Sequence, residues 1–292
     1  MPSLKEVRNK IVSVGSTMQI TSAMKMVSAA KLKRAQDAVT QMRPYANKLR
    51  EILQNVSASV DASDNVYARN SPARRVAIIP VSSNRGLAGA FNSNIIKKTN
   101  SIIAEEFPGA EITIIPVGKK VQDAFRKTKY LISGQDVPHH AGNVFEKLSY
   151  DNARPIIEKI IDSFLAKEFD RVVIVYNQFR NAAVQLPVAE QLLPIVPSQV
   201  AGKKSRVDYI FEPSQEFMVQ ELIPRSVKTQ FYKALLDSFA SEHGARMTAM
   251  HKATDNAKAM QRELKIMYNK ARQAAITKEI LEIVGGAEAL KG

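Results

Sequence analysis

The chain has no cysteine and no tryptophan, and aromatic residues make up only 7% of its 292 residues. Without cysteine there is no disulfide, no zinc–thiolate site and no thiol nucleophile. No apolar run reaches the roughly 18–20 residues that a membrane-spanning helix needs. The start, "MPSLKEVRNKIVSVG", also lacks the apolar core of a signal peptide. We therefore expect a soluble protein whose mature form begins near Met1, and the missing cysteine fits a reducing compartment.

Acidic residues are scarce at the start of the chain. The first 50 positions hold ten basic residues and two acids, Glu6 and Asp37, and the whole chain carries a net charge of +14. A basic helix of this kind attracts nucleic acid, an anionic membrane or an acidic protein surface. A well-solvated helix face is an equally open interpretation of charge alone.

Apolar residues recur at alternating steps of three and four through residues 4–60. These steps, taken from Leu4 to Val60, give seventeen positions, of which fourteen are apolar. The three exceptions, Thr21, Lys25 and Ser28, follow one another in this series. A heptad pattern this long predicts a coiled coil. Pro44 should kink the helix, because it lacks a backbone donor and crowds the preceding turn. At the three exceptions we expect the apolar stripe to rotate around the helix toward four neighbours: Ile20, Ala23, Met24 and Val27.

The C-terminal segment has the same rhythm. Pro224 interrupts its beginning, so the long helix should start near Arg225. After Ala274 the rhythm slips to an apolar tip. The positions expected to face the partner helix are Tyr232, Leu236, Phe239, His243, Arg246, Met250, Ala253, Ala257, Met260, Leu264, Met267, Ala271 and Ala274.

The middle of the chain alternates strands with helices. Three β-branched runs, "RRVAIIPVSSNRG", "AEITIIPVG" and "DRVVIVYNQF", predict buried strands. The segments "SNIIKKTNSIIAEEF" and "DNARPIIEKIIDSFLAKEF" have helical spacing, which predicts a mostly parallel sheet with helices on its faces. Two further stretches, "AAVQLPVAEQLLPI" and "RVDYIFEP", are expected to be edge strands.

The fold class that follows is α/β. A long antiparallel coiled coil of the N- and C-terminal helices is joined to a central Rossmann-like α/β domain. The expected divisions are 1–60, 61–213 and 214–292. The two helices should be ~55 and ~65 residues, or ~80 and ~100 Å, so the C-terminal helix should extend past its partner by roughly ten to twenty residues. Its apolar tip would then need a socket in another protein.

No catalytic centre is evident in the sequence. "SSNRGLAGAFNSN" (82–94) follows a strand and opens a helix, but its two glycines fit neither phosphate-loop pattern, so we expect a structural turn. His139 and His140 are adjacent and point apart, while His243 and His251 are two helical turns apart. No serine lies in a G-x-S-x-G elbow. We expect no catalytic residue, no bound metal and no cofactor.

Two functions remain open from pattern alone: a rigid helical rod that engages a protein complex, or a basic coiled coil that binds nucleic acid. Nucleic-acid rods concentrate basic residues where helices enter a groove, often beside stacking aromatics. Here the basic residues are spread, and Tyr232 and Phe239 lie near the domain end. The apolar tip favours the protein socket.

Several motifs resemble one known family. "KEVRNKIVSVGSTMQITSAMKMVSAAKLKRAQ" resembles the opening helix of the gamma chain of rotary F-type ATP synthases. "SEHGARMTAMHKATDNA" and "LKIMYNKARQAAITKEILEIVGGAEAL" are similar to its closing helix. The signature residues of that family's tail are Ile276, Thr277, Glu279, Glu282, Gly286 and Ala287. "SSNRGLAGAFN" is similar to its turn, except that Asn84 replaces the usual Asp and Ala88 a common Cys.

The resemblance implies a non-catalytic rotor subunit that couples transmembrane ion flow to ATP synthesis or hydrolysis. Its coiled coil would turn inside a ring of three alpha and three beta subunits. Its α/β domain would sit on the membrane rotor (the c-ring) with the epsilon subunit, without nucleic acid or a small-molecule substrate of its own. The implied location is peripheral, at the cytoplasmic face of the bacterial inner membrane.

The resemblance also implies roles for individual residues. Contacts with a beta subunit would come from Arg272, Gln273, Met24, Lys25, Lys31, Lys33 and Arg34. The apolar bearing tip would comprise Ile276, Ile280, Ile283, Val284, Ala287 and Leu290. Contact with the membrane rotor would come from Tyr209, Phe211 and Glu212. Solvated helix residues, plain coiled-coil packing and an ordinary edge strand are the alternatives for these three sets.

Overall fold

The computed structural model describes residues 3–59, 66–69, 71–131, 141–195 and 218–289. They fall into two compact units, Met1–Ser28 with Met247–Gly292, and Ala29–Arg246. Two long helices contribute residues to both units: α1, Leu4–Ser59, and α6, Ile223–Ala289. Their lengths, 56 and 67 residues, agree with those predicted.

The Ala29–Arg246 unit is built on a four-stranded sheet in the order β2-β1-β3-β4. Its strands are β1 (Arg75–Pro80), β2 (Glu111–Ile114), β3 (Arg171–Phe179) and β4 (Gln185–Leu193). β1 pairs in parallel with β2 and β3, while β4 runs antiparallel at the edge. The predicted mostly parallel sheet and the edge strand in "AAVQLPVAEQLLPI" are confirmed.

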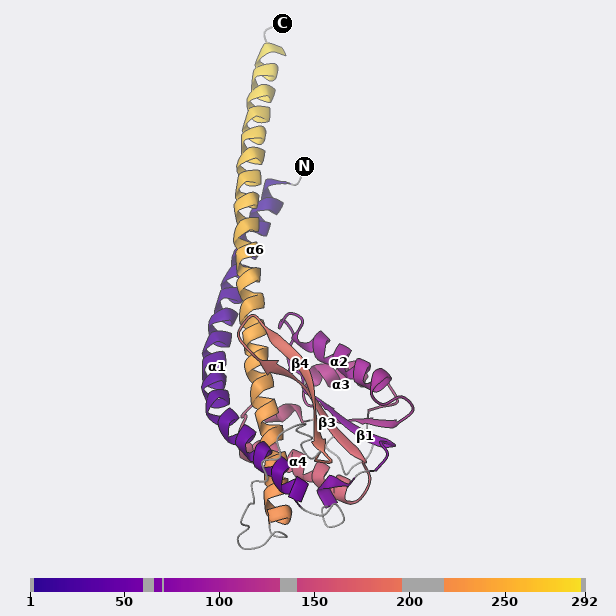
Figure 1. Cartoon of the computed structure of the whole chain (residues 1–292). Coiled ribbons are helices and arrows are strands. Elements are labelled where there is room, and N and C mark those ends of the chain that lie inside the picture. Colours follow the sequence, from indigo (N-terminus) through magenta and orange to yellow (C-terminus); the bar gives the residue numbers. More distant parts are fainter. Residues whose placement is uncertain (1–2, 60–65, 70, 132–140, 196–217, 290–292) are drawn as a thin grey trace. The chain divides into compact units, whose positions relative to one another are not determined.

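Helices cover both faces of the sheet (Figure 1). One apolar core joins the sheet to α4 (Tyr150–Leu165) and to the beginning of α6. The other joins it to α2 (Phe91–Glu105) and α3 (Lys119–Phe125). Parallel strands covered on both faces must be apolar throughout, and β1 is buried at every position after Arg75. Shorter turns lie at Val66–Ala68 and Gly142–Phe145.

Local sequence explains where the helices begin. Ser149 caps α4, since its hydroxyl accepts a hydrogen bond from the backbone N–H of Asn152. A π-helical turn, Met218–Leu222, leads into α6, which begins at Ile223. Pro224 therefore falls in the first turn, where proline is tolerated, two residues earlier than the predicted start suggested. α1 continues through Pro44, and Figure 1 shows its second half curving; a kink at Pro44 itself stays a prediction.

Within the Met1–Ser28 and Met247–Gly292 unit, α1 and α6 pair in antiparallel fashion. Thr254 Oγ1 donates to Thr21 Oγ1 at 2.9 Å, and a side chain at Gly15 would lie 3.1 Å from Gln261 Nε2. Thr21 thus lies opposite Thr254, and Gly15, earlier in α1, lies opposite Gln261, later in α6. Continuing this alignment to the start of α1 places Leu4 near Ala271. α6 continues from there to Ala289, as predicted (Figure 1).

The contact face of α1 follows the predicted heptads but does not rotate. Thr21 and Ser28 are buried and Lys25 is half-buried, whereas Ile20 and Val27 are 60% and 57% exposed. The predicted shift toward Ile20, Ala23, Met24 and Val27 is therefore wrong. Small polar side chains fit a close helix pair, and the Thr21–Thr254 hydrogen bond satisfies the buried hydroxyls.

Half of the predicted contact face of α6 is displaced by one residue. Met250, Ala257, Leu264 and Ala271 face α1 as expected, but Met260 and Met267 are 53% and 47% exposed. The less exposed positions beside them are Thr254, Gln261 and Tyr268. Polar residues occupy this part of the face because they meet Thr21 and the small Gly15.

Candidate partner-binding surfaces

The last turns of α6 carry an exposed apolar face. Ile276, Ile280, Ile283 and Val284 are 48%, 55%, 72% and 50% exposed, and Ala287 is also exposed. Their spacing places them on one side of the helix, while Lys278 and Glu282 form an ion pair at 3.5 Å. Exposed large apolar side chains grouped in this way mark a binding surface.

Arg272 and Gln273 are both exposed and lie in the stretch of α6 where the pairing with α1 ends. Met24 and Lys25 of α1 are half-buried, so these two side chains are partly engaged in helix packing. Lys31, Lys33 and Arg34 are exposed. Lys33 pairs with Asp37 at 2.9 Å on the surface of the helix. A partner can therefore reach the side chains of Arg272, Lys31, Lys33 and Arg34, and it can reach Lys25 in part.

Sequence reasoning missed two exposed apolar residues of α1, Val12 and Met26, which are 64% and 65% exposed. Neither lies on a predicted heptad position, and an isolated exposed apolar residue is common on protein surfaces. Together with Ile20 and Val27 they give this helix an apolar outer surface. The sequence signal for this surface is the presence of several large apolar residues in α1 at positions outside the heptad pattern.

The segment 82–94 is a tightly hydrogen-bonded turn, as predicted. Ser83 Oγ donates to the backbone O of Arg85 at 2.6 Å, and the backbone N–H of Ser83 donates to Asn92 Oδ1 at 3.0 Å. Asn84 Nδ2 donates to the backbone O of Gly142, while Asn84 Oδ1 accepts from the N–H of Lys119. These polar groups are thus used within the fold.

A buried ionic cluster of α6 holds the same turn. Arg246 Nη1 donates to Glu242 Oε1 at 2.6 Å, and Arg246 Nη2 donates to the backbone O of Arg85 at 3.2 Å. Burial raises the pKa of Glu242, while Arg246, Lys31 and Arg85 act against that rise. Sequence reasoning placed Arg246 on the coiled-coil face. The i,i+4 spacing of Glu242 and Arg246 was the signal that it overlooked.

His243 is a buried neutral histidine. Its ring packs edge-on against that of Phe239, with the ring centroids 4.5 Å apart, and its Nδ1 has no hydrogen-bond partner among the residues that the structure describes. Burial, together with Arg246 and Lys31, lowers its pKa to about 3 from the ordinary 6.5. The folded state therefore excludes the proton that the unfolded chain accepts below pH 6.5.

This shift predicts acid destabilisation that depends on His243. The stability from keeping it neutral is fully present above pH 6.5 and is lost as the pH falls toward 3, at about 1.4 kcal/mol per pH unit. Urea unfolding of the full chain at pH 7 and pH 5 measures it. Against His243→Leu, wild type should lose about 2 kcal/mol more between these pH values. Equal losses in both proteins would show that His243 is not buried in neutral form.

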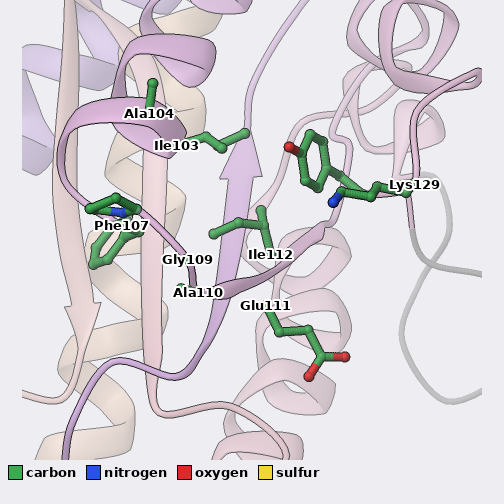
Figure 2. A pocket seen from close by; sticks show the side chains of 10 residues that line it. Ile103, Ala104, Phe107, Gly109, Ala110, Glu111, Ile112 and Lys129 are labelled. Carbon is green, nitrogen blue, oxygen red and sulfur yellow. The ribbon is translucent and has the colours of Figure 1, made fainter.

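A cavity of about 520 Å³ lies where α2 ends and β2 begins. Figure 2 shows Ile103 and Ala104 from the end of α2, Phe107 just after it, Glu111 and Ile112 from β2, and Lys129. The lining combines apolar side chains with the charged Glu111 and Lys129. Among the described residues, no three His, Asp or Glu side chains gather as a possible metal site, and no helix there is long and apolar enough to cross a membrane.

Some predicted residues cannot be placed. Tyr209, Phe211 and Glu212 lie outside the described residues, as does Leu290 at the end of the tip. The stretch "RVDYIFEP" and the pair His139 and His140 lie outside them too.

The described elements define the class of fold: a four-stranded α/β sheet unit, together with two long helices that pair in antiparallel fashion. A chain of the mitochondrial ATP synthase of Euglena gracilis, solved with its OSCP, F1 and c-ring parts, has the same fold. Its TM-score is 0.69 at 24% identity, and the match covers 98% of this chain and 94% of that one.

Sequence comparison gives the family. The family model described as ATP synthase matches residues 3–290. The ATP synthase gamma chain of Flavobacterium psychrophilum is 55% identical and that of Flavobacterium johnsoniae 53%, each over the full length of both proteins. The chain belongs to the ATP synthase gamma chain family. These comparisons give no support to the nucleic-acid-binding alternative.

Proposed function

We propose that this chain is the central-stalk rotor subunit of an ATP synthase, with the two-helix rod turning inside a ring of alpha and beta subunits. One observation carries the proposal: α6 extends past the start of α1 and exposes Ile276, Ile280, Ile283 and Val284. Large apolar side chains exposed together on one side of a helix mark a surface that binds a partner. The 55% identity to a gamma chain over the full length of both proteins supports the proposal that this partner is the top of that ring.

The exposed residues have distinct roles in this proposal. Arg272 can hydrogen-bond a beta-subunit loop through its planar guanidinium, with Gln273 beside it. Lys31, Lys33 and Arg34 offer positive charge to acidic tips of the beta subunits, and the partly packed Met24 and Lys25 add to the same contact. The tip serves as an apolar bearing, in which the absence of directional bonds allows rotation. Tyr209, Phe211 and Glu212 are proposed to touch the c-ring beside the epsilon subunit.

The work of this subunit is mechanical. An asymmetric rod contacts each beta subunit differently at each angle, so it stabilises open and closed states in turn. A partner can shift a conformational equilibrium only by such differences in contact energy. The nucleotide chemistry would belong to the alpha and beta subunits, and this chain would contribute no catalytic residue. Its place would be peripheral, at the cytoplasmic face of the bacterial inner membrane.

Reconstitution tests the proposal. The full-length chain and a version ending at Ala275 are each purified with alpha and beta subunits, and ATP hydrolysis is measured with and without them. We expect a stoichiometric complex that hydrolyses ATP, while the chain alone hydrolyses none. The truncated version should form a weaker complex, because it lacks the apolar face. A chain that fails to assemble and instead binds DNA with a steep salt dependence would overturn the rotor function.

A further inference from the structure

A network of charged groups joins α1 to its neighbours inside the Ala29–Arg246 unit. Arg43 of α1 donates through Nη2 to the backbone O of Phe179 in β3 and to Oδ1 of Asp237 in α6, both at 2.6 Å. One side chain thus connects three elements that are far apart in sequence.

A second set of contacts lies in the same part of the unit and centres on Glu190 of β4. Tyr176 of β3 donates its hydroxyl to Glu190 Oε1 at 2.6 Å. Lys233 of α6 lies 3.5 Å from the same carboxylate, and Arg50 of α1 lies 3.9 Å from it. Arg43 of α1 therefore reaches both the sheet and α6, and Arg50, two turns further along α1, reaches the sheet.

Burial makes Asp237 a costly member of this network. Asp237 is fully buried, and its second oxygen, Oδ2, has no hydrogen-bond partner within the described part of the chain. Burial raises the pKa of Asp237, against the opposing effects of Arg43 and Lys233. Buried ion pairs contribute little net stability compared with apolar residues of the same volume, but they can fix one arrangement of helices. A role in positioning explains the network better than a role in stability.

α1 is the helix that needs to be fixed. Residues 233–238 of α6 are buried on every side of the helix, so the sheet and its neighbours hold that helix firmly. α1 is buried along one face only, through small or apolar residues, and such contacts are non-directional. The buried residues of this face are Leu32, Ala35, Val39, Ala46 and Leu49.

We propose that Arg43, Asp237 and Glu190 form a torsional joint that fixes α1 to α6 and to the sheet, so that torque passes between the α/β domain and both helices. The inference rests on the proposed rotor function. In it Arg43 and Asp237 are positioning residues: they set the stiffness of the rotor and touch no partner. Without the joint, α1 would turn against α6 under load.

The test measures angular fluctuation of the rotor. The chain is assembled with alpha and beta subunits, fixed to a surface through beta, and arrested with a non-hydrolysable ATP analogue. A gold particle is attached through the substitution Asn100→Cys, at an exposed position of α2. The sequence of this chain has no cysteine, so the substitution introduces its only thiol. The variance of the particle's angle is inversely proportional to torsional stiffness.

The decisive variant is Arg43→Met with Asp237→Leu, which replaces the pair by apolar residues and leaves neither charge without its partner. We expect its angular variance to rise about twofold, since charge-assisted hydrogen bonds are the most directional contacts of α1. The control is Lys48→Met with Glu51→Leu, an exposed ion pair within α1 itself. It should leave the variance unchanged. Equal variance in the two variants would overturn the joint.

A milder variant keeps the proposal testable should the double substitution prevent assembly. Arg43→Lys retains the charge facing Asp237 but cannot hold both Phe179 O and Asp237 with the same geometry. Its variance should lie between those of wild type and the double variant, and an unchanged value would also overturn the joint. Failure of the wild-type chain to assemble with alpha and beta subunits is a different result, because it contradicts the rotor function itself.

Discussion

Replacing Ile280, Ile283 and Val284 by aspartate should reduce coupled ATP synthesis at least about tenfold. Burial of one such side chain is worth about 2 kcal/mol, so three contribute about 6 kcal/mol to the contact between the tip and its socket. Aspartate would also place charge in an apolar site. The measurement is ATP synthesis by the reconstituted complex in vesicles, alongside the amount of subunit assembled.

The control for this prediction lies on the same turns of α6. Lys278→Ser removes the ion pair with Glu282 but leaves the apolar face unchanged. It should assemble and synthesise ATP as wild type does. If the aspartate variant matched wild type in both assays, the tip would not be buried in the complex.

Arg246→Ala should lower the free energy of unfolding of the chain by about 3–5 kcal/mol, the usual cost of breaking a buried ion pair on one side. The substitution leaves the carboxylate of Glu242 buried without its 2.6 Å partner, and it removes the donor to the backbone O of Arg85. Urea unfolding at pH 7 measures the loss.

The matched variant for that prediction removes both charges. Glu242→Leu with Arg246→Met should be nearer to wild type in stability than Arg246→Ala, because no buried charge is left unpaired. If Arg246→Ala unfolds at the same urea concentration as wild type, the Glu242–Arg246 pair is solvated rather than buried.

The sequence predicted the helices and the sheet well because both depend on periodic burial. The heptad positions of α1 held even at Thr21 and Ser28, where apolar character fails. β1, β2 and β3 were recognisable because parallel strands are apolar throughout. Where either of two neighbouring residues could lie on the contact face of a helix, their hydrophobicity alone does not predict which of them does. Met260 is more apolar than Gln261, yet Gln261 is the less exposed of the two because Gly15 leaves room for it.

The charged contacts that join α1 to the sheet and to α6 were not predictable in the same way. Arg43, Glu190 and Asp237 lie far apart in the sequence, and each alone resembles a surface residue. Only the fold shows that they meet. The exposed tip, in contrast, could be predicted from sequence, since the lengths of the two helices and their antiparallel pairing determine how far α6 extends.

The Thr21–Thr254 hydrogen bond has a consequence for the distant tip. A continuous apolar contact face permits neighbouring alignments of two helices, and a single polar contact selects one of them. A slip of one heptad would change the free length of α6 by about 10 Å. The hydrogen bond between these two hydroxyl groups thus helps to fix the alignment of α1 against α6. That alignment sets the length of α6 that extends past α1, and so how deeply its last turns can reach into a partner.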